Sequence, residues 1–262
     1  MPAQSDQRDS SALLPVSVRL ALWCTAAYAG QLPLPQALAR AHPDVDHVGG
    51  DLSRLELWRD LGESVVLVSL PRPGDVTGMP SGSLDLVGAA TAAGECAFVP
   101  GIGGALVPAV EAFGPEGDQG TQVVWTAYDC DPVPTHRVEA LSLGEIEMRL
   151  REDLLSHTSD LEDLDVRPWA GSDMRRIADE RLAHRAWGVP ESVPRRALRV
   201  LSLAGTVSET ADLGLEAGPT GLNSVANTAH RAVLTQLRHV AERALADATN
   251  VAALTIAGAL PS

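Results

Sequence analysis

The chain has 262 residues and carries 34 acidic residues against 20 basic ones, a formal net charge of −14. Such a field repels phosphate groups, so we expect no nucleic acid and no anionic membrane among its partners. Every basic residue is an arginine, which excludes Schiff-base lysines, a P-loop lysine and a lysine general base.

The composition is that of a globular protein with an aliphatic core. Hydrophobic residues make up 45% of the chain but aromatic residues only 3%, so leucine, valine and alanine must fill the interior. The length allows one large domain or two small ones. The absence of lysine, together with frequent alanine, leucine, arginine and glycine, is typical of a GC-rich genome.

The cysteines and the N-terminal region indicate a cytoplasmic protein. Cys24, Cys96 and Cys130 are widely spaced and form no C-x-x-C pair, so we expect three reduced thiols. A Cys96–Cys130 disulfide is the alternative if their segments are neighbouring strands. The apolar run at residues 20–29 lacks a basic region before it and is too short to cross a membrane.

The first half of the chain alternates between helical and strand patterns. Helices are predicted at residues 15–30, 35–41, 51–62 and 83–94, each bounded by proline, aspartate or glycine signals. Strands are predicted at residues 65–68, 96–100 and 121–128, where β-branched and aromatic residues cluster.

One segment of the first half can be interpreted in two ways. Ala105–Phe113 as a strand would form a hairpin with Thr121–Tyr128, and Pro108 would then require an edge position or a bulge. The same segment as a helix would place Pro108 near its first turn, where proline is tolerated. We favour the hairpin.

The second half is helical throughout. Ser142-Leu143-Gly144-Glu145 fits a capping box, and further helices are predicted at residues 172–187, 194–204 and 223–257, with a break at Gly205 before a second capping box at Thr206. The fold class is therefore α+β: a small, mainly antiparallel sheet covered by helices, followed by an all-helical part. We expect a flexible tail at 1–12, a sheet-containing part at 13–140 and a helical part at 141–262.

The glycine cluster at residues 101–104 is a candidate ligand site. Gly101, Gly103 and Gly104 could present backbone amides to an anion. The spacing is not that of a dinucleotide fingerprint, and a phosphate loop normally leads into a helix. A tight β corner that needs positive φ explains the same glycines without a ligand.

Three residues after the best predicted strand form a candidate metal site. Asp129, Asp131 and His136 give the pattern D-x-D-x4-H, in which the two carboxylates at i and i+2 face the same side of a strand. Hard cations prefer such oxygen ligands, although no further ligand is evident nearby. Turn formation beside Pro132 is the competing explanation, and the sequence indicates no particular cofactor.

Other constellations carry weaker signals. His42 and His47 flank two aspartates in a loop that could bind a metal, and Cys96 or Cys130 with His136 could form a nucleophilic pair. Three short helices followed by strands could mimic a winged helix, but the third helix is not on a positive face. None of these patterns identifies a catalytic set.

The helices of the second half suggest contacts with other proteins. Residues 145–165 hold eight acids and two arginines, and residues 167–199 hold eight arginines and four acids. These segments could neutralise each other or bind a partner. The long helix at 223–257 carries an alanine-rich stripe suited to a homodimer interface or to intramolecular packing. We therefore expect a non-catalytic protein that acts through protein contacts or homodimerisation; the alternative is a small-molecule- or metal-binding protein or enzyme with its site near Gly101–Gly104 and Asp129/Asp131.

Overall fold

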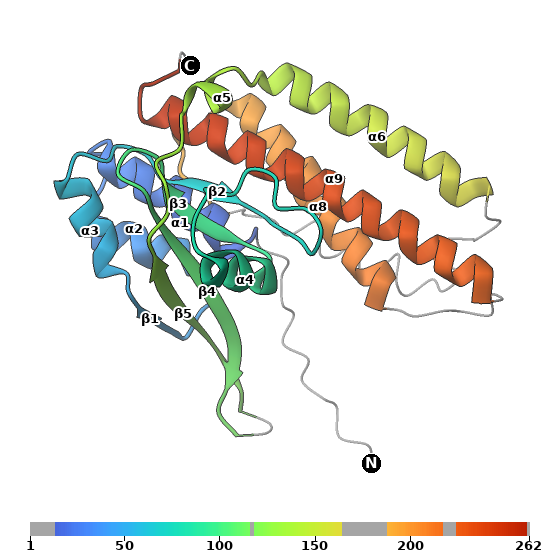
Figure 1. Cartoon of the computed structure of the whole chain (residues 1–262), viewed down its shortest axis with the longest axis horizontal. Helices are drawn as coiled ribbons and strands as arrows, with labels where there is room; N and C mark the ends of the chain where they lie inside the picture. The colour runs from blue at the N-terminus through green and yellow to red at the C-terminus, as the bar shows by residue number, and fades with distance from the viewer. Residues whose placement is uncertain (1–13, 116–117, 164–187, 217–223, 261–262) are drawn as a thin grey trace.

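A computed structural model describes residues 14–115, 118–163, 188–216 and 224–260 (Figure 1). The fold is α+β, as the sequence predicts: a five-stranded sheet with helices comes first, and long helices follow. The elements are α1 (Val16–Tyr28), α2 (Leu34–Ala41), β1 (His47–Gly50), α3 (Ser53–Asp60), β2 (Leu67–Ser69), α4 (Leu84–Ala93), β3 (Cys96–Val99), β4 (Gly104–Phe113), β5 (Gly120–Tyr128), α5 (His136–Glu139), α6 (Leu143–Asp163), α8 (Arg195–Glu216) and α9 (Ser224–Ile256).

The sheet has the strand order β1-β5-β4-β3-β2, with every neighbouring pair antiparallel except β1 and β5. The long hairpin of β4 and β5 confirms that Ala105–Phe113 is a strand. Pro108 lies opposite Trp125 of β5, beyond Leu106, where pairing with β3 ends. The proline therefore occupies an edge, as its missing N–H requires.

Strand β1 is absent from the sequence prediction, which placed His47 in a loop. The strand has four residues and ends in two glycines, so it carries no alternating hydrophobic pattern. Its last residue, Gly50, has φ +93°, and a Cβ there would lie 2.0 Å from the carbonyl oxygen of Trp125. Only glycine permits this close approach between β1 and β5.

The core lies on both faces of the sheet. Alternate residues of the strands face opposite sides, so that Val123 and Trp125 pack toward α1 and α2, whereas Phe98 and Val107 pack toward α4. Helix α1 is buried from Val16 to Ala27, as expected for a mostly apolar helix. It joins the sheet to α8 and α9 within one hydrophobic cluster.

The C-terminal helices pack on one another and on the sheet. Helix α9 contacts α6, α8, α1 and β2, and α6 and α9 run side by side (Figure 1). The apolar stripe of α9 is thereby buried inside its own chain, including Leu237, Ala244, Ala248 and Val251. Within the residues described, no helix is long and apolar enough to span a membrane.

The predicted break at Gly205 is wrong. Helix α8 runs without interruption through Gly205, although glycine costs about 1 kcal/mol relative to alanine in a helix. The buried side chains of Leu201, Ala204 and Ala211 anchor both halves in the core, so tertiary packing outweighs the local propensity. Thr206 does not begin a new helix: its hydroxyl donates to the Ser202 carbonyl, 2.8 Å away. The helix predicted at 172–187 lies outside the described residues.

Polar contacts hold α9 against β2 and the loop that follows it. The side chain of Asn250 accepts from the Val68 N–H at 2.7 Å and donates to the Val68 carbonyl at 2.9 Å. Arg72 donates to the buried carboxylate of Glu242, with an Nε–Oε2 distance of 2.8 Å. Asn250 thus forms, with the backbone N–H and carbonyl at the edge of β2, the hydrogen bonds that a neighbouring strand would form.

Folding stability should decrease in mild acid because of His42. Burial is the largest cause that lowers the pKa of His42 below its ordinary value of 6.5, and the Leu38 carbonyl opposes it. Above pH 6.5 the imidazole is neutral in both states. Below it the unfolded chain takes up a proton that the folded chain resists, so the free energy of unfolding falls by up to about 1.4 kcal/mol at pH 5.5.

Urea unfolding at pH 7.5 and 5.5 measures this loss. The charged side chains that act on the His42 imidazole are those of Arg19 and Asp44, and both stay unchanged in the comparison. The variant His42→Gln keeps an acceptor for Trp125 but cannot titrate, and it should lose less stability between the two pH values. An equal loss in both proteins would contradict the assignment to His42.

Candidate functional site

The glycine corner is tightly packed in the structure. Gly103 has φ +78°, and a Cβ there would lie 2.1 Å from the carbonyl oxygen of Cys130. A Cβ on Gly104 would lie 2.7 Å from the indole of Trp58, and one on Gly101 would lie 2.7 Å from a carboxylate oxygen of Glu63. Close packing thus accounts for all three glycines.

A side-chain carboxylate of the protein itself, that of Glu63, occupies this corner. The Ile102 N–H donates to Oε1 of Glu63 at 2.5 Å, and Glu63 is only 8% exposed. The corner therefore uses a backbone amide to hold a buried carboxylate. Binding of an external ligand by Gly101, Gly103 and Gly104 stays a prediction.

The three residues of the predicted metal site lie at the surface. Asp129, Asp131 and His136 are all exposed, and His136 begins the short helix α5. Across the parts of the chain that the structure describes, no group of three or more histidine, cysteine, aspartate or glutamate residues could hold a metal ion. Metal binding at Asp129, Asp131 and His136 stays a prediction.

The histidine–aspartate loop before β1 has structural partners. The Trp125 indole N–H donates to Nε2 of His42 at 3.2 Å. Arg19, whose side chain is 1% exposed, pairs with Asp44 at 2.5 Å, and Asp46 accepts from the Thr121 N–H at 2.8 Å. These side chains fasten the loop to α1 and β5.

The three cysteines are free thiols, as predicted. Burial raises the pKa of Cys96 to about 12 and that of Cys130 to about 11, and Cys24 is shifted in the same direction for the same reason. These groups remain protonated at neutral pH, so they lack the thiolate character of a cysteine nucleophile.

The outer half of β4 is a free sheet edge. Strand β3 pairs with β4 only as far as Leu106, whereas β5 pairs with it as far as Phe113. Among the strands that the structure describes, none covers the other side of β4 from residue 107 to residue 113. The hairpin projects beyond the rest of the sheet there (Figure 1).

Backbone hydrogen bonds to β1 fix the direction of the peptide groups of β5. The Asp46 N–H donates to the Thr121 carbonyl at 2.9 Å, and the Asp51 N–H donates to the Trp125 carbonyl at 2.8 Å. Because successive residues of a strand direct their backbone N–H and carbonyl groups to alternate sides, the odd-numbered residues of β5 form backbone hydrogen bonds with β1. Even-numbered residues of β5 therefore bond to β4.

The same alternation identifies the groups at the free edge. Val124 lies opposite Ala109, so the odd-numbered residues of β4 bond to β5. Pro108, Val110 and Ala112 consequently direct their backbone groups outward. Pro108 has no N–H to donate at this edge, and no strand among those described lies there to accept one.

An apolar groove lies beside this edge. A cavity of about 430 Å³ separates the C-terminal end of α4 from the outer half of β4. Its apolar lining includes Ala89, Ala92 and Ala93 of α4 and Val107 of β4. Large hydrophobic residues are exposed nearby, at Val110, Phe113 and Val124. The edge and the groove together form a surface that suits an extended apolar segment.

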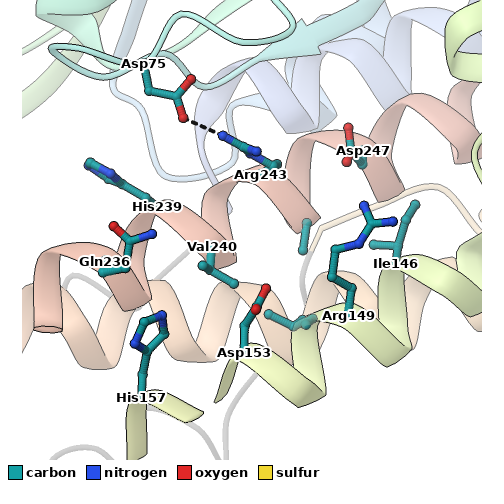
Figure 2. A pocket seen from close by; sticks show the side chains of 12 residues that line it. Asp75, Ile146, Arg149, Asp153, His157, Gln236, His239, Val240, Arg243 and Asp247 are labelled. Carbon is teal, nitrogen blue, oxygen red and sulfur yellow. Dashed lines mark hydrogen bonds and ion pairs between the residues drawn. The ribbon is translucent and has the colours of Figure 1, made fainter. Parts of the chain in front are cut away.

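A second concavity, of about 340 Å³, lies between α6 and α9 and is lined by several charged side chains (Figure 2). Arg149 and Asp153 of α6 face Arg243 and Asp247 of α9 across it. The loop after β2 contributes Asp75, whose carboxylate accepts from Arg243 at 2.6 Å. This polar cleft shares part of its lining with a smaller cavity of about 90 Å³ beside β2.

Sequence reasoning missed both surfaces for understandable reasons. The free edge depends on where β3 stops pairing, and the only local signal was Pro108. The polar cleft brings together helices from distant parts of the sequence. Spacing on α6 offered one clue, since Arg149, Asp153 and His157 recur at four-residue intervals and therefore share a helix face.

Comparison with known proteins places both parts of the chain in one family. Residues 17–139 match the family model of the Rv1486c-like protein, N-terminal domain, and residues 144–246 match that of the Rv1486c-like protein, C-terminal domain. No curated protein and no solved structure matched the chain. Because the two matched segments cover most of the sequence, the protein belongs to the Rv1486c-like family.

Proposed function

We propose that the protein acts through contact with a second copy of itself, in assembly rather than in catalysis. The two copies pair along the free edge of β4, antiparallel, about a two-fold axis at Val110. The observation that carries the proposal is the one-sided pairing of β4 from residue 107 to residue 113. An unpaired row of backbone groups is a template for another strand.

The centre of the free segment determines the register. Pairing about Val110 lets its N–H donate to the carbonyl of the partner's Val110, and the reverse. The Ala112 N–H then donates to the carbonyl of the partner's Pro108. That proline has no N–H, so this pair forms one hydrogen bond rather than two. A two-fold axis at Glu111 would instead set two carboxylates directly opposite each other, which is destabilising.

The same register brings an aromatic side chain to the groove. Phe113 then lies opposite the partner's Val107, on the face of the sheet that α4 covers. Val107 lines the groove together with the alanines of α4, and Phe113 is 40% exposed in the single chain. Each copy would fill the groove of the other with its Phe113, which removes apolar surface from water.

Electrostatics favours this part of the surface for self-association. Two copies with a net charge of −14 each repel one another, so an interface should carry few acids. Between residues 107 and 113 the strand has one acidic side chain, Glu111, which accepts from the side-chain amide of Gln122 at 3.2 Å. The remaining residues of this segment are uncharged.

The alternative is that Pro108 and Glu111 protect an edge that stays in water. That arrangement predicts a monomer at every concentration. Light scattering coupled to size exclusion separates the two cases, and our proposal predicts a molar mass of twice the chain at micromolar concentration.

A charge at the two-fold axis should disrupt the dimer without disturbing the fold. In Val110→Lys, two ammonium groups would face each other, and we expect the dimer affinity to fall at least about tenfold. Val110 is 53% exposed, so the single chain tolerates the change. The matched control is Leu155→Lys on α6, an equally aliphatic side chain that is 73% exposed.

Truncating the aromatic side chain tests the groove separately. Phe113→Ala should weaken the dimer about tenfold, because part of a phenylalanine side chain returns to water. The melting temperature of the monomeric Phe113→Ala variant should differ little from that of the wild type. If Leu155→Lys dissociates the dimer and Val110→Lys does not, the interface lies on α6 and the proposal is wrong.

A further inference from the structure

We infer that Glu95 makes the proposed dimer sensitive to pH, so that the two copies associate more tightly in mild acid than at neutral pH. The inference rests on the proposed pairing of β4, because it concerns the groove that the partner's Phe113 fills. Its basis is the position of Glu95 at the end of the free edge, on the wall of that groove.

Glu95 lies where β3 begins and the free edge of β4 starts. Ala97 of β3 pairs with Leu106 of β4, so continuing that register places Glu95 level with Pro108. Glu95 is also one of the residues that line the groove between α4 and β4, and it is partly exposed in the single chain. A partner strand paired with β4 would therefore cover the surface that Glu95 borders.

The single chain already holds the Glu95 carboxylate in a mixed environment. Its Oε2 accepts from the Ser17 N–H at 2.8 Å, in the first turn of α1, which favours the charged form. Burial acts in the opposite direction and is the largest cause that raises the pKa of Glu95 above its ordinary value of 4.5, whereas Ser17, Arg19 and Arg72 oppose the shift.

The charged and titratable groups around Glu95 come from several elements. Arg19 of α1 and Arg72 of the loop after β2 act on it from within the chain. Glu111 of β4 and Tyr128 of β5 line the same groove, to which α4 contributes alanines. Inside the chain, the two arginines thus counter the effect of burial.

The partner would supply no further positive charge to this groove. Residues 107–113 contain no basic side chain, and the proposed register sets the partner's Glu111 opposite Ala109, on the same face as the partner's Phe113. The incoming phenyl ring displaces water, and the incoming carboxylate repels negative charge. Both effects disfavour a charged Glu95, so its pKa should be higher in the dimer than in the single chain.

The direction of the pH effect follows from this difference. Above both pKa values, Glu95 is charged in the single chain and in the dimer, and association bears the full cost of covering the charge. Between them, the dimer holds a proton that the single chain has released. Below both, Glu95 is neutral in either state and the cost is gone. The dimer affinity therefore rises as the pH falls through the pKa of Glu95 in the dimer.

Sedimentation equilibrium at pH 7.5 and 5.5 measures this effect. We expect the wild-type dimer affinity to be at least about tenfold higher at pH 5.5, since each dimer contains two copies of Glu95. Glu95→Gln keeps an acceptor for the Ser17 N–H but takes up no proton. It should associate at pH 7.5 about as tightly as the wild type does at pH 5.5, with little change between the two.

The matched control is Glu152→Gln on α6, an exposed acid. It changes the net charge by the same amount as Glu95→Gln and should keep the wild-type pH dependence. Dilution calorimetry of the wild type at pH 6.5 adds a measurement that needs no variant. Dissociation should release protons, so the heat should differ between phosphate and imidazole buffers, whose ionisation enthalpies differ, and this difference should shrink in Glu95→Gln.

The outcomes separate the pH effect from the dimer itself. A dimer whose affinity is equal at the two pH values, or lower in acid, would overturn the role of Glu95 and leave the pairing of β4 intact. The same holds if Glu95→Gln keeps the full pH dependence of the wild type. A wild type that is monomeric at both pH values would contradict the proposed dimer, and the role of Glu95 with it.

Discussion

Replacing Trp125 with alanine should lower the free energy of unfolding by about 3–5 kcal/mol, because the change empties the centre of the sheet. Trp125 is completely buried in the middle of β5. Its ring meets that of His42 edge-on, with centroids 5.9 Å apart, and its N–H donates to that imidazole. Alanine would leave both a cavity and an unpaired buried nitrogen.

Urea unfolding monitored by circular dichroism measures this loss. Trp125→Phe separates the two causes, since it fills most of the volume but leaves the His42 nitrogen without its donor, and it should cost about 1–3 kcal/mol. Val124→Ala alters the adjacent exposed position and should cost no more than about 0.5 kcal/mol. A loss below 1 kcal/mol in Trp125→Ala would mean that Trp125 does not organise the core.

The second large effect is expected at Glu242, which joins α9 to the loop after β2. Its side chain is 5% exposed and accepts two hydrogen bonds from Arg72, with Arg238 at 4.0 Å. Glu242→Ala would leave two neighbouring guanidinium groups without this carboxylate, and we expect a loss of about 3 kcal/mol. The change removes the contact between α9 and Arg72 in the loop after β2, whereas the Asn250–Val68 hydrogen bonds remain.

A double-mutant cycle tests whether the ion pair causes this loss. Removing both partners in Arg72→Ala/Glu242→Ala should cost less than the sum of the two single changes, because no unpaired charge remains. Glu152→Ala on the exposed face of α6 is the matched control and should change stability by about 0.5 kcal/mol or less. Strictly additive losses would show that the two side chains act independently.

The fold could be predicted wherever a local pattern agreed with the tertiary packing. The helix predicted at residues 83–94 is confirmed as α4, where the Ser83 hydroxyl accepts from the Leu86 N–H at 3.2 Å. The cluster of β-branched and aromatic residues at 121–128 likewise identified β5. The prediction failed at Gly205 because burial on both sides outweighs one glycine. It failed at β1 because four residues in parallel pairing carry no pattern of their own. The expected division of the chain near residue 140 stays a prediction.

The candidate sites were harder to predict because they depend on tertiary contacts. The glycines at 101, 103 and 104 indicated backbone amides available to an anion, but the sequence could not show that Glu63, 39 residues from Ile102, supplies one. The alanine stripe of α9 suited either a homodimer interface or intramolecular packing, and the structure uses that stripe to pack α9 inside its own chain. We therefore propose the free edge of β4, rather than α9, as the surface for a second copy.

The role of the acidic and basic segments of the second half also depends on tertiary contacts that the sequence does not show. Most of residues 167–199 lie outside the described residues. Where both partners are described, Arg196 of α8 pairs with Glu147 of α6, 3.5 Å apart. This pair agrees with mutual neutralisation, although a pair this exposed contributes little to stability.

Disulfide trapping at Val110 tests the proposed dimer most directly. At a two-fold axis through a hydrogen-bonded pair, the two Val110 Cα atoms would lie about 5.5 Å apart, within the range of a disulfide. Val110→Cys should therefore form a covalent dimer under mild oxidation. Ala112→Cys on the same strand should not, because it lies opposite the partner's Pro108. The wild type, with Cys24 and Cys96 buried, gives the background. A monomeric wild type whose Val110→Cys variant cross-links no faster than Ala112→Cys would contradict the account.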